Sequence, residues 1–507
     1  MNTKSKKRIS IVGLFTLFFM VGCQGQIIDT NELVVAQSGD PVSLDPHATN
    51  DNRSALVINQ IFEPLVRQTE NLELIPWLAE SWERIDDRTY EFHLREGVYF
   101  HNGEPMRASD VKFSMVRATK SPTSRAILGE INPDSIEIIN DYTIRIGTHE
   151  PFAPLLAHLA HTSGNIMSEK AATYHGDNFG QNPVGTGPFV FKNWIQGDRV
   201  ELARNNNYHG DMANTERLVI RNITEIGNRL IELETGQVDI AMDISPTDIE
   251  RVNNHAELKL IQEPNLRMHY IGFNTQHEQM NDVRIRQAIN YAIDVNLIID
   301  TILEGSGIRA LGPLPIDIFG AHQDLEGYGH DPERAKELLA EAEIPNGFSL
   351  SILTDDDTVR VTIATVVRSQ LERVGIDASI EILEWATFLD ATANGTHEMF
   401  IMGWTSVTAD ADYGLFPLFH SSMFGAGGNR AFYSNERVDQ LLEQAREELD
   451  AEIRLAYYLE IQEIIVRDAP WVFLNVGENV IGLRENVRGF VANPSGHHRF
   501  SRVSLEK

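Results

Sequence analysis

Short β-rich runs recur through the first half of the chain and predict strands separated by tight turns. Residues 32–38 form one such run, and residues 89–94 alternate strictly between two faces. Residues 135–147 alternate on both sides of Asn140-Asp141, which predicts two strands joined by a turn. Between these strands, Ser109 precedes a run with helical spacing, and we expect it to cap the first turn of a helix.

The second half of the chain contains longer runs with helical spacing, separated by short apolar runs. A strand at residues 348–354, a helix at 359–375 and a strand at 378–385 follow one another directly. This β-α-β order favours a parallel, doubly wound sheet. Further helices are predicted at residues 332–342, 438–449 and 451–467, and a further strand at 397–404.

The first 23 residues have the pattern of an export signal. Four basic residues within positions 4–8 precede an apolar run at residues 9–21, which is too short to be a stable membrane span. Gly22 and Cys23 follow, and Cys23 is the only cysteine in 507 residues. The alternative role for a lone cysteine is a thiol buried in the fold, and in either case it cannot form an internal disulfide.

Composition and the absence of certain motifs argue against several classes of function. The formal net charge is −30, from 73 acidic and 43 basic residues, which argues against nucleic acid as a partner because phosphate binding needs clustered lysine and arginine. The sequence contains no GxSxG, P-loop or HExxH motif. His497-His498 has no third ligand nearby in the sequence. We therefore expect neither an enzyme nor a cofactor or metal site.

Several longer segments carry a resemblance to known proteins. Met20-Val21-Gly22-Cys23 resembles the lipobox of bacterial lipoproteins, in which the cysteine is acylated and the peptide is cut before it. Segments further along resemble, in order, the family-5 extracellular solute-binding proteins, the peptide and nickel receptors of ABC importers. These segments are SLDPHATNDNRSALVINQIFEPLV (43–66), PWLAESWERIDDRTYEFHLREGVYFHNGEPMRASDVKFS (76–114), NPVGTGPFVFKNWIQGDRVELARNNNYHG (182–210) and NDVRIRQAINYAID (281–294).

The resemblance covers about residues 32–480, nearly all of the mature chain. Residues 403–445 look most like the glutathione- and dipeptide-type branch. The implied fold is α/β, with two periplasmic-binding-protein-like lobes of the class II peptide-receptor type, two crossover strands and a ligand cleft between the lobes. The implied domains are a signal peptide (1–22), a lipidated tether (23–31), lobe I (32–70, 185–275 and 481–507), an extra α+β domain (71–184) and lobe II (276–480).

The resemblance also implies how a peptide would be held. In peptide-binding relatives an aspartate after a Gly-Trp motif pairs with the ligand's α-ammonium. Here Gly403-Trp404 is followed by Asp410 and Asp412, of which we favour Asp410; a solvated loop acid or a helix N-cap is the alternative for either. Trp404 either forms the floor of the pocket or is a residue of the strand core.

The ligand carboxylate would meet a cation of the second lobe. Arg360, at the start of the helix in the β-α-β unit, is the first candidate, because backbone N–H groups there also favour anions. Arg430, beside a glycine pair, is the second. Asn52 and Arg53 either line the cleft or belong to a surface loop.

The resemblance thus implies a monomeric receptor, anchored through Cys23 at the outer face of the cytoplasmic membrane, that delivers short peptides or glutathione to an ABC permease and ATPase. Two alternatives stay open. The chain could be a nickel or metal-chelate receptor of the same family, or a ligand sensor that is not coupled to transport.

Overall fold

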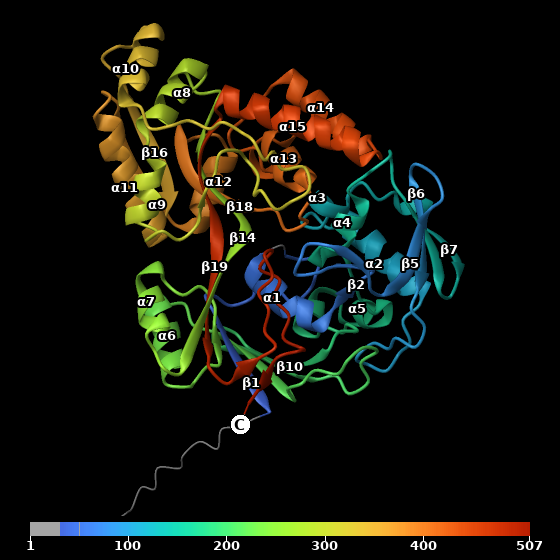
Figure 1. The fold of residues 1–507 in the computed structure, drawn as a ribbon. Helices are drawn as coiled ribbons and strands as arrows, with labels where there is room; N and C mark the ends of the chain where they lie inside the picture. Colours follow the sequence, from blue (N-terminus) through green and yellow to red (C-terminus); the bar gives the residue numbers. More distant parts are fainter. Residues whose placement is uncertain (1–30, 50, 507) are drawn as a thin grey trace, which may run out of the picture.

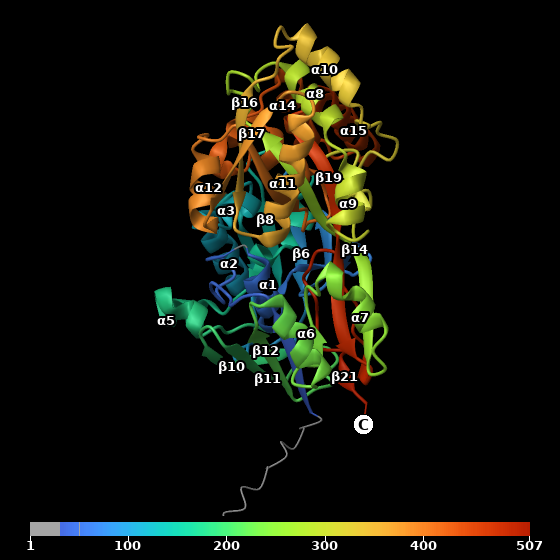
Figure 2. The same ribbon diagram turned by 90° about the vertical axis from the view of Figure 1, so that its left-hand side faces the viewer.

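Eleven strands form one sheet that passes through both lobes of the molecule (Figures 1 and 2). Their order is β10-β11-β12-β1-β13-β19-β14-β18-β16-β17, and β15 also pairs with β19. The computed structural model describes residues 31–49 and 51–506. The expected signal peptide, Cys23 and nearly all of the expected tether lie outside the described residues.

The first lobe is built on one end of this sheet. Its strands are β1 (Glu32–Gln37), β10 (Phe189–Ile195), β11 (Arg199–Arg204), β12 (Arg217–Asn222) and β13 (Ile240–Ala241). Its helices are α1 (Asn52–Ile61), α6 (Ile226–Glu234) and α7 (Ile249–Asn253). Helix α1 begins where the Asp51 carboxylate accepts the Ser54 N–H at 2.9 Å, and it buries an apolar face that includes Val57 and Ile58.

The second lobe is built on the other end of the sheet and has two buried cores. Its strands are β15 (Ile308–Arg309), β16 (Ser349–Asp355), β17 (Asp377–Leu383) and β18 (Met399–Thr405). Its helices are α8 (Val283–Ala292), α9 (Val295–Thr301), α10 (Pro332–Glu341), α11 (Thr358–Glu372), α12 (Trp385–Ala393), α13 (Ala411–Phe419), α14 (Glu436–Glu447) and α15 (Ala451–Asp468).

Two long antiparallel strands connect the lobes. Strand β14 (Leu258–Phe273) pairs with β19 (Trp471–Arg484) along most of its length, with a break in register after Pro264. The first-lobe end of β19 pairs with β13, and the second-lobe side of β14 pairs with β18. Figure 2 shows both strands running from the second lobe into the first. The sheet is therefore continuous, and any movement between the lobes must bend these two strands.

A smaller domain lies at the side of the first lobe and has its own core. Its four-stranded sheet has the order β5-β6-β8-β7, with β5 (Ala79–Arg84), β6 (Thr89–Leu94), β7 (Glu137–Asn140) and β8 (Thr143–Gly147). Its helices are α2 (Ala108–Lys120), α3 (Arg125–Leu128), α4 (Leu155–Leu159) and α5 (Glu169–His175). Three short pairs complete the fold: β2 (Glu63–Pro64) with β9 (Asn165–Ile166), β3 (Val66–Gln68) with β4 (Leu74–Pro76), and β20 (Val487–Arg488) with β21 (Ser504–Leu505).

Most predicted elements are present. The β-α-β unit is formed by β16, α11 and β17, and its two strands pair in parallel. The predicted Ser109 cap is wrong: α2 begins at Ala108 with Arg107 as N-cap residue, and the Arg107 N–H donates to Asp110 at 3.0 Å. The expected residue ranges of the three domains stay predictions.

Candidate functional site

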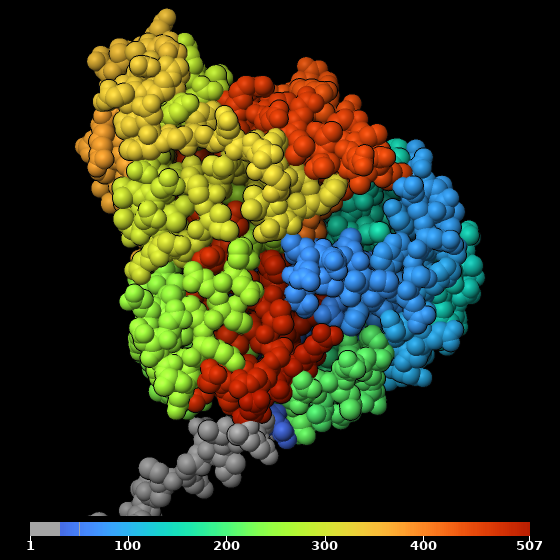
Figure 3. All heavy atoms as spheres, in the orientation of Figure 1, coloured from blue at the N-terminus to red at the C-terminus, as the bar shows by residue number. Residues whose placement is uncertain are grey.

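Two cavities lie between the lobes, along the connecting strands. They share Asp243, Asn265 and Arg267 in their linings, so together they form one cleft, with volumes of about 210 Å³ and 290 Å³. Cavities of this size fit a small ligand such as a short peptide. In the space-filling view, the segments nearest the C-terminus (red) lie between α6 and α7 (green) and the first hundred residues (blue) (Figure 3).

The alternation of β14 determines which of its side chains face the cleft. Leu266, Met268 and Tyr270 point into the second-lobe core. Because side chains of a strand alternate between faces, Arg267 and His269 point the other way, and both line the cleft. The same strand thus contributes an apolar face to the core and a basic face to the site.

Gly403, in the neighbouring strand β18, leaves room for these side chains. A Cβ at Gly403 would lie 3.0 Å from Nε of Arg267 and 3.3 Å from Nδ1 of His269. Any larger residue would push the Arg267 guanidinium out of place. The glycine of the Gly-Trp pair is therefore explained by the shape of the cleft.

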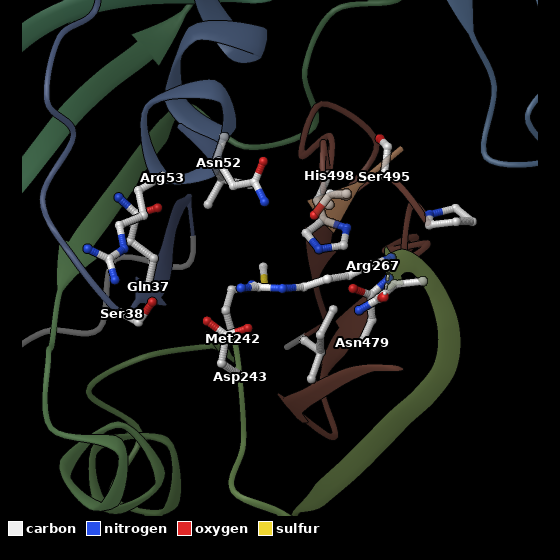
Figure 4. A pocket seen from close by; sticks show the side chains of 16 residues that line it. Gln37, Ser38, Asn52, Arg53, Met242, Asp243, Arg267, Asn479, Ser495 and His498 are labelled. Carbon is white, nitrogen blue, oxygen red and sulfur yellow. Dashed lines mark hydrogen bonds between the residues drawn. The ribbon is translucent and has the colours of Figure 1, made fainter. Parts of the chain in front are cut away.

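Arg267 is the central cation of the cleft. Its Nε is buried, and its guanidinium makes no hydrogen bond or ion pair with any described residue. Burial lowers the pKa of Arg267, and the nearby Arg360 cation lowers it further, against the attraction of Asp243. Figure 4 shows Arg267 extending across the first cavity toward Asp243. A cation in this position is available to an anionic group of a ligand.

Arg360 lines the same cleft from the second lobe. It lies in the first turn of α11, where Asp357 caps the helix by accepting the Arg360 N–H at 3.0 Å. Its Nη1 donates to Asp355 at 2.6 Å, and its guanidinium lies 5.7 Å from the centre of the Trp385 ring. These contacts hold the side chain in one orientation while its remaining N–H groups can face a ligand.

The first lobe contributes the opposite wall. Asn52 and Arg53 stand at the start of α1, line the first cavity and are exposed. Figure 4 shows them across the cavity from Arg267 and Asn479. No hydrogen bond or ion pair joins the Arg53 guanidinium to another described residue. Arg53, Arg267 and Arg360 thus reach the cleft from the first lobe, the connecting strands and the second lobe.

Asp243 is the acid that faces both cavities. It follows β13, is exposed and adopts φ 53°, a left-handed conformation that is uncommon outside glycine and is enriched at binding sites. Its carboxylate accepts no hydrogen bond from any described residue. The cleft therefore presents an unpaired anion as well as unpaired cations.

Two further acids line the second cavity, Asp357 and Glu478, and Glu478 is already bonded. It accepts hydrogen bonds from Ser306 Oγ at 2.8 Å, from the Gly307 N–H at 3.0 Å and from Gln262 Nε2 at 2.8 Å. Glu478 thus serves to fix the connecting strand β19 against the loop after α9.

Two histidines in the cleft are neutral near pH 7. Burial holds the pKa of His269 well below its usual value, and the charges of Arg267 and Arg360 lower it further. Burial lowers the pKa of His498 to about 4. His498 Nδ1 accepts the Asn493 N–H at 3.0 Å, so its neutral tautomer carries the proton on Nε2. These rings add hydrogen-bonding groups to the cleft without adding charge.

Of the predicted site residues, Arg360, Asn52 and Arg53 line the cleft, and the other four lie elsewhere. Asp410 is buried and is the N-cap of α13. Its two carboxylate oxygens accept hydrogen bonds from Arg454 at 2.5 and 2.8 Å. Burial lowers the pKa of Arg454, but the charge of Asp410 raises it overall. The helix-cap alternative therefore describes Asp410, and its contact with a ligand stays an untested prediction without support from this geometry.

Asp412 is also buried in an internal cluster. It accepts a hydrogen bond from Arg446 at 2.8 Å and lies 3.3 Å from Nε2 of His158, in the small domain. Burial raises the pKa of Asp412, but Arg446 and His158 together hold it well below its usual value. The ligand role of Asp412 therefore also stays a prediction.

Trp404 and Arg430 have structural partners. Trp404 Nε1 donates to the Tyr413 carbonyl at 3.0 Å, and its ring packs against the second-lobe core. Arg430 Nη1 donates at 2.6 Å to both the Leu389 carbonyl and Thr392 Oγ1, which attaches its loop to α12. Neither residue is among those that line the two cavities.

Sequence reasoning missed Arg267, His269 and Asp243. The alternation of apolar and basic residues in Leu266-Arg267-Met268-His269-Tyr270 was a usable signal, because it predicts a strand with one basic face. Asp243 gave no such signal, since its place depends on the local turn after β13.

Comparison with known proteins identifies the same family as the resemblance found in the sequence. The family model described as bacterial extracellular solute-binding proteins, family 5, matches residues 73–426. The dipeptide-binding protein of Escherichia coli K12 is 28% identical, over 94% of this chain and 95% of its own length. The glutathione-binding protein GsiB of Pectobacterium atrosepticum is 29% identical, over 94% of both chains.

Solved structures agree with this result. The periplasmic binding protein DppA of Helicobacter pylori, in complex with the peptide STSA, is 32% identical and superposes with a TM-score of 0.85, covering 94% of this chain and 98% of its own. No helix within the described residues has the length and apolar character needed to cross a membrane.

Proposed function

The chain belongs to family 5 of the bacterial extracellular solute-binding proteins, and on this premise we propose that it is the receptor of an ABC importer for short peptides. The peptide binds in the cleft between the lobes, and the lobes close around it by bending β14 and β19. Closure of this kind is a hinge motion, which a ligand stabilises through its higher affinity for the closed state.

The observation that carries this proposal is the placement of opposite charges in one small cleft. Arg360, held by Asp355 at 2.6 Å, is positioned to bind a peptide carboxylate. Asp243, whose carboxylate accepts no hydrogen bond from a described residue, is positioned to bind the α-ammonium. Main-chain charges are common to all peptides, so a receptor that binds them accepts many side chains. The ammonium partner proposed here is Asp243, because Asp410 and Asp412 are bonded to Arg454 and Arg446.

Calorimetric titration of the purified, ligand-stripped chain tests the proposal. The titrants are a dipeptide, a five-residue peptide, glutathione, and nickel with histidine. We expect the dipeptide or glutathione to bind, and Asp243→Asn to weaken binding by about 1.5–3 kcal/mol, the contribution of a charged hydrogen bond. Binding of the nickel–histidine complex alone would contradict the peptide assignment and favour a metal-chelate receptor.

We also propose that Cys23 is acylated and anchors the receptor to the outer face of the cytoplasmic membrane. The first described strand, β1, begins at Glu32, so about eight residues would connect the lipid to the fold. In the host, Cys23→Ser should leave the chain unprocessed or release it from the membrane fraction, whereas the control Gln26→Ala should behave as the native chain. A Cys23→Ser chain that stayed processed and membrane-bound would refute the anchor.

A further inference from the structure

The charged groups of the cleft divide into those that already have partners and those that do not. Asp355 pairs with Arg360, and Asp357 caps α11. Glu478 accepts three hydrogen bonds. Asp355 and Arg360 balance each other's charge, while Asp357 and Glu478 keep their charges and have their oxygens bonded to neutral N–H and O–H donors.

Three charged side chains make no hydrogen bond or ion pair among the described residues: Arg53, Arg267 and Asp243. All three line the first cavity, and Arg267 and Asp243 also line the second. Two of these three unpaired side chains are cations, and both lie where a ligand in the first cavity could reach them.

An unpaired guanidinium between two lobes is costly unless a ligand neutralises it. Arg267 Nε is already out of contact with water and has no hydrogen-bond partner. Closure of the lobes would remove more water from the guanidinium, which raises the cost of leaving it unpaired. The cost disappears when an anionic group of the ligand takes the place of the missing partner.

We propose that the ligand is a peptide-like zwitterion with one additional carboxylate and a net charge of −1, and that Arg267 binds the additional carboxylate. This inference rests on the proposed peptide function. The α-ammonium meets Asp243 and the α-carboxylate meets Arg360, as proposed above. The additional carboxylate belongs to an acidic side chain or a γ-linked glutamyl group, and Arg267, between the two lobes, is its partner.

Matched peptide pairs test the assignment. Ala-Glu against Ala-Gln and Glu-Ala against Gln-Ala differ in one carboxylate at nearly constant shape, and glutathione supplies a γ-glutamyl ligand. Each is titrated into the native full chain, Arg267→Gln, Arg267→Lys and the control Arg437→Gln. The control removes an exposed arginine that pairs with Glu460, outside the cleft.

The proposal predicts that the acidic member of at least one pair, or glutathione, binds the native chain roughly 10- to 100-fold more tightly than the neutral peptides. Arg267→Gln should reduce that affinity to the level of the neutral peptides and leave the neutral peptides unaffected. Arg267→Lys should retain part of the preference, and Arg437→Gln all of it. Circular dichroism and thermal melts verify that each variant is folded.

Two results would overturn the inference and leave the peptide function in place. One is equal affinity for acidic and neutral peptides, and the other is an acidic preference that persists in folded Arg267→Gln. If no peptide binds the native chain, the proposed function fails, and glutarate becomes the probe. Glutarate binding that is lost in Arg267→Gln would retain Arg267 as an anion site, and its absence would reject that as well.

Discussion

Arg267 combines a binding role with an unfavourable position. A half-buried cation whose Nε has neither water nor a hydrogen-bond partner destabilises the ligand-free fold, since part of its hydration is lost and nothing replaces it. We predict that Arg267→Gln raises the melting temperature of the ligand-free protein, by an amount that corresponds to about 1 kcal/mol. Calorimetric scanning measures this, with Arg437→Gln as the control that should change little. A clear decrease for Arg267→Gln would show that the guanidinium has a stabilising partner.

Asp410, in contrast to Arg267, stabilises the ligand-free fold. Its carboxylate neutralises Arg454 in the second-lobe core, where both side chains are only 8% exposed. We predict that Asp410→Asn lowers the free energy of unfolding by about 3–5 kcal/mol, because it leaves a buried arginine without its anion. Denaturant titration measures the change.

The control for Asp410→Asn is Asp450→Asn. Asp450 caps α15 at the surface, and asparagine is an equally good cap, so this variant should stay within about 0.5 kcal/mol of the native chain. An Asp410→Asn protein of native stability that no longer binds peptide would instead support Asp410 as the ammonium partner.

These residues show what the sequence can and cannot predict about the site. Arg360 was found because a helix start is recognisable from local pattern, and its cleft position follows from the β-α-β unit. Asp410 and Asp412 are aspartates that follow the Gly403-Trp404 pair, as the family resemblance led us to expect. Their partners, Arg454 and Arg446, lie 44 and 34 residues away, so their pairing cannot be read locally.

At the scale of elements, local periodicity predicted the β-α-β unit and the late helices. It did not predict the two connecting strands. Strands β14 and β19 have 16 and 14 residues, well beyond the usual length of about 5–6. Each passes from one environment to another, with a register break in β14 after Pro264. A single periodic pattern therefore does not cover either strand, and the crossover was expected from family resemblance alone.

The two-residue strand β2 contains Glu63, whose carboxylate is bonded to several segments that are distant in the sequence. Glu63 is fully buried and accepts hydrogen bonds from Trp77 Nε1 at 2.7 Å, Tyr208 Oη at 2.6 Å and Thr186 Oγ1 at 2.8 Å, and it lies 3.0 Å from His209 Nε2. Burial would raise the pKa of Glu63, but His209 and the hydroxyl donors lower it to about 2. This carboxylate joins segments of the first lobe and the small domain.

A folded-state pKa below the unfolded value has a definite consequence for stability. Glu63 contributes stability that is fully present above its ordinary pKa of 4.5 and is lost as the pH falls toward 2. We predict that Glu63→Gln lowers the melting temperature at pH 7, and that the difference from the native chain shrinks between pH 4.5 and pH 2. Melts across this pH range measure the difference. A constant difference would show that the Glu63 charge does not matter to folding.

At the scale of the whole molecule, the two lobes and the small domain are joined to one another by two sets of contacts. The connecting strands join the lobes, while a second contact joins the small domain to the second lobe. There the Arg446 guanidinium bonds Asp412 and lies 3.3 Å from Glu130, and the Arg446 backbone carbonyl accepts the Ala153 N–H at 2.7 Å. The Gln68 amide also donates to the Thr408 carbonyl at 3.0 Å. Movement of the lobes therefore has to preserve or break these contacts as well as bend two strands.

The central claim is that the cleft holds a small peptide-like ligand with an additional carboxylate. Native mass spectrometry of the chain purified from its host, followed by fragmentation of the released ligand, tests it most directly. We predict a single adduct that fragments as a short peptide or γ-glutamyl compound of net charge −1. A bound metal chelate or a neutral or cationic peptide would contradict the claim.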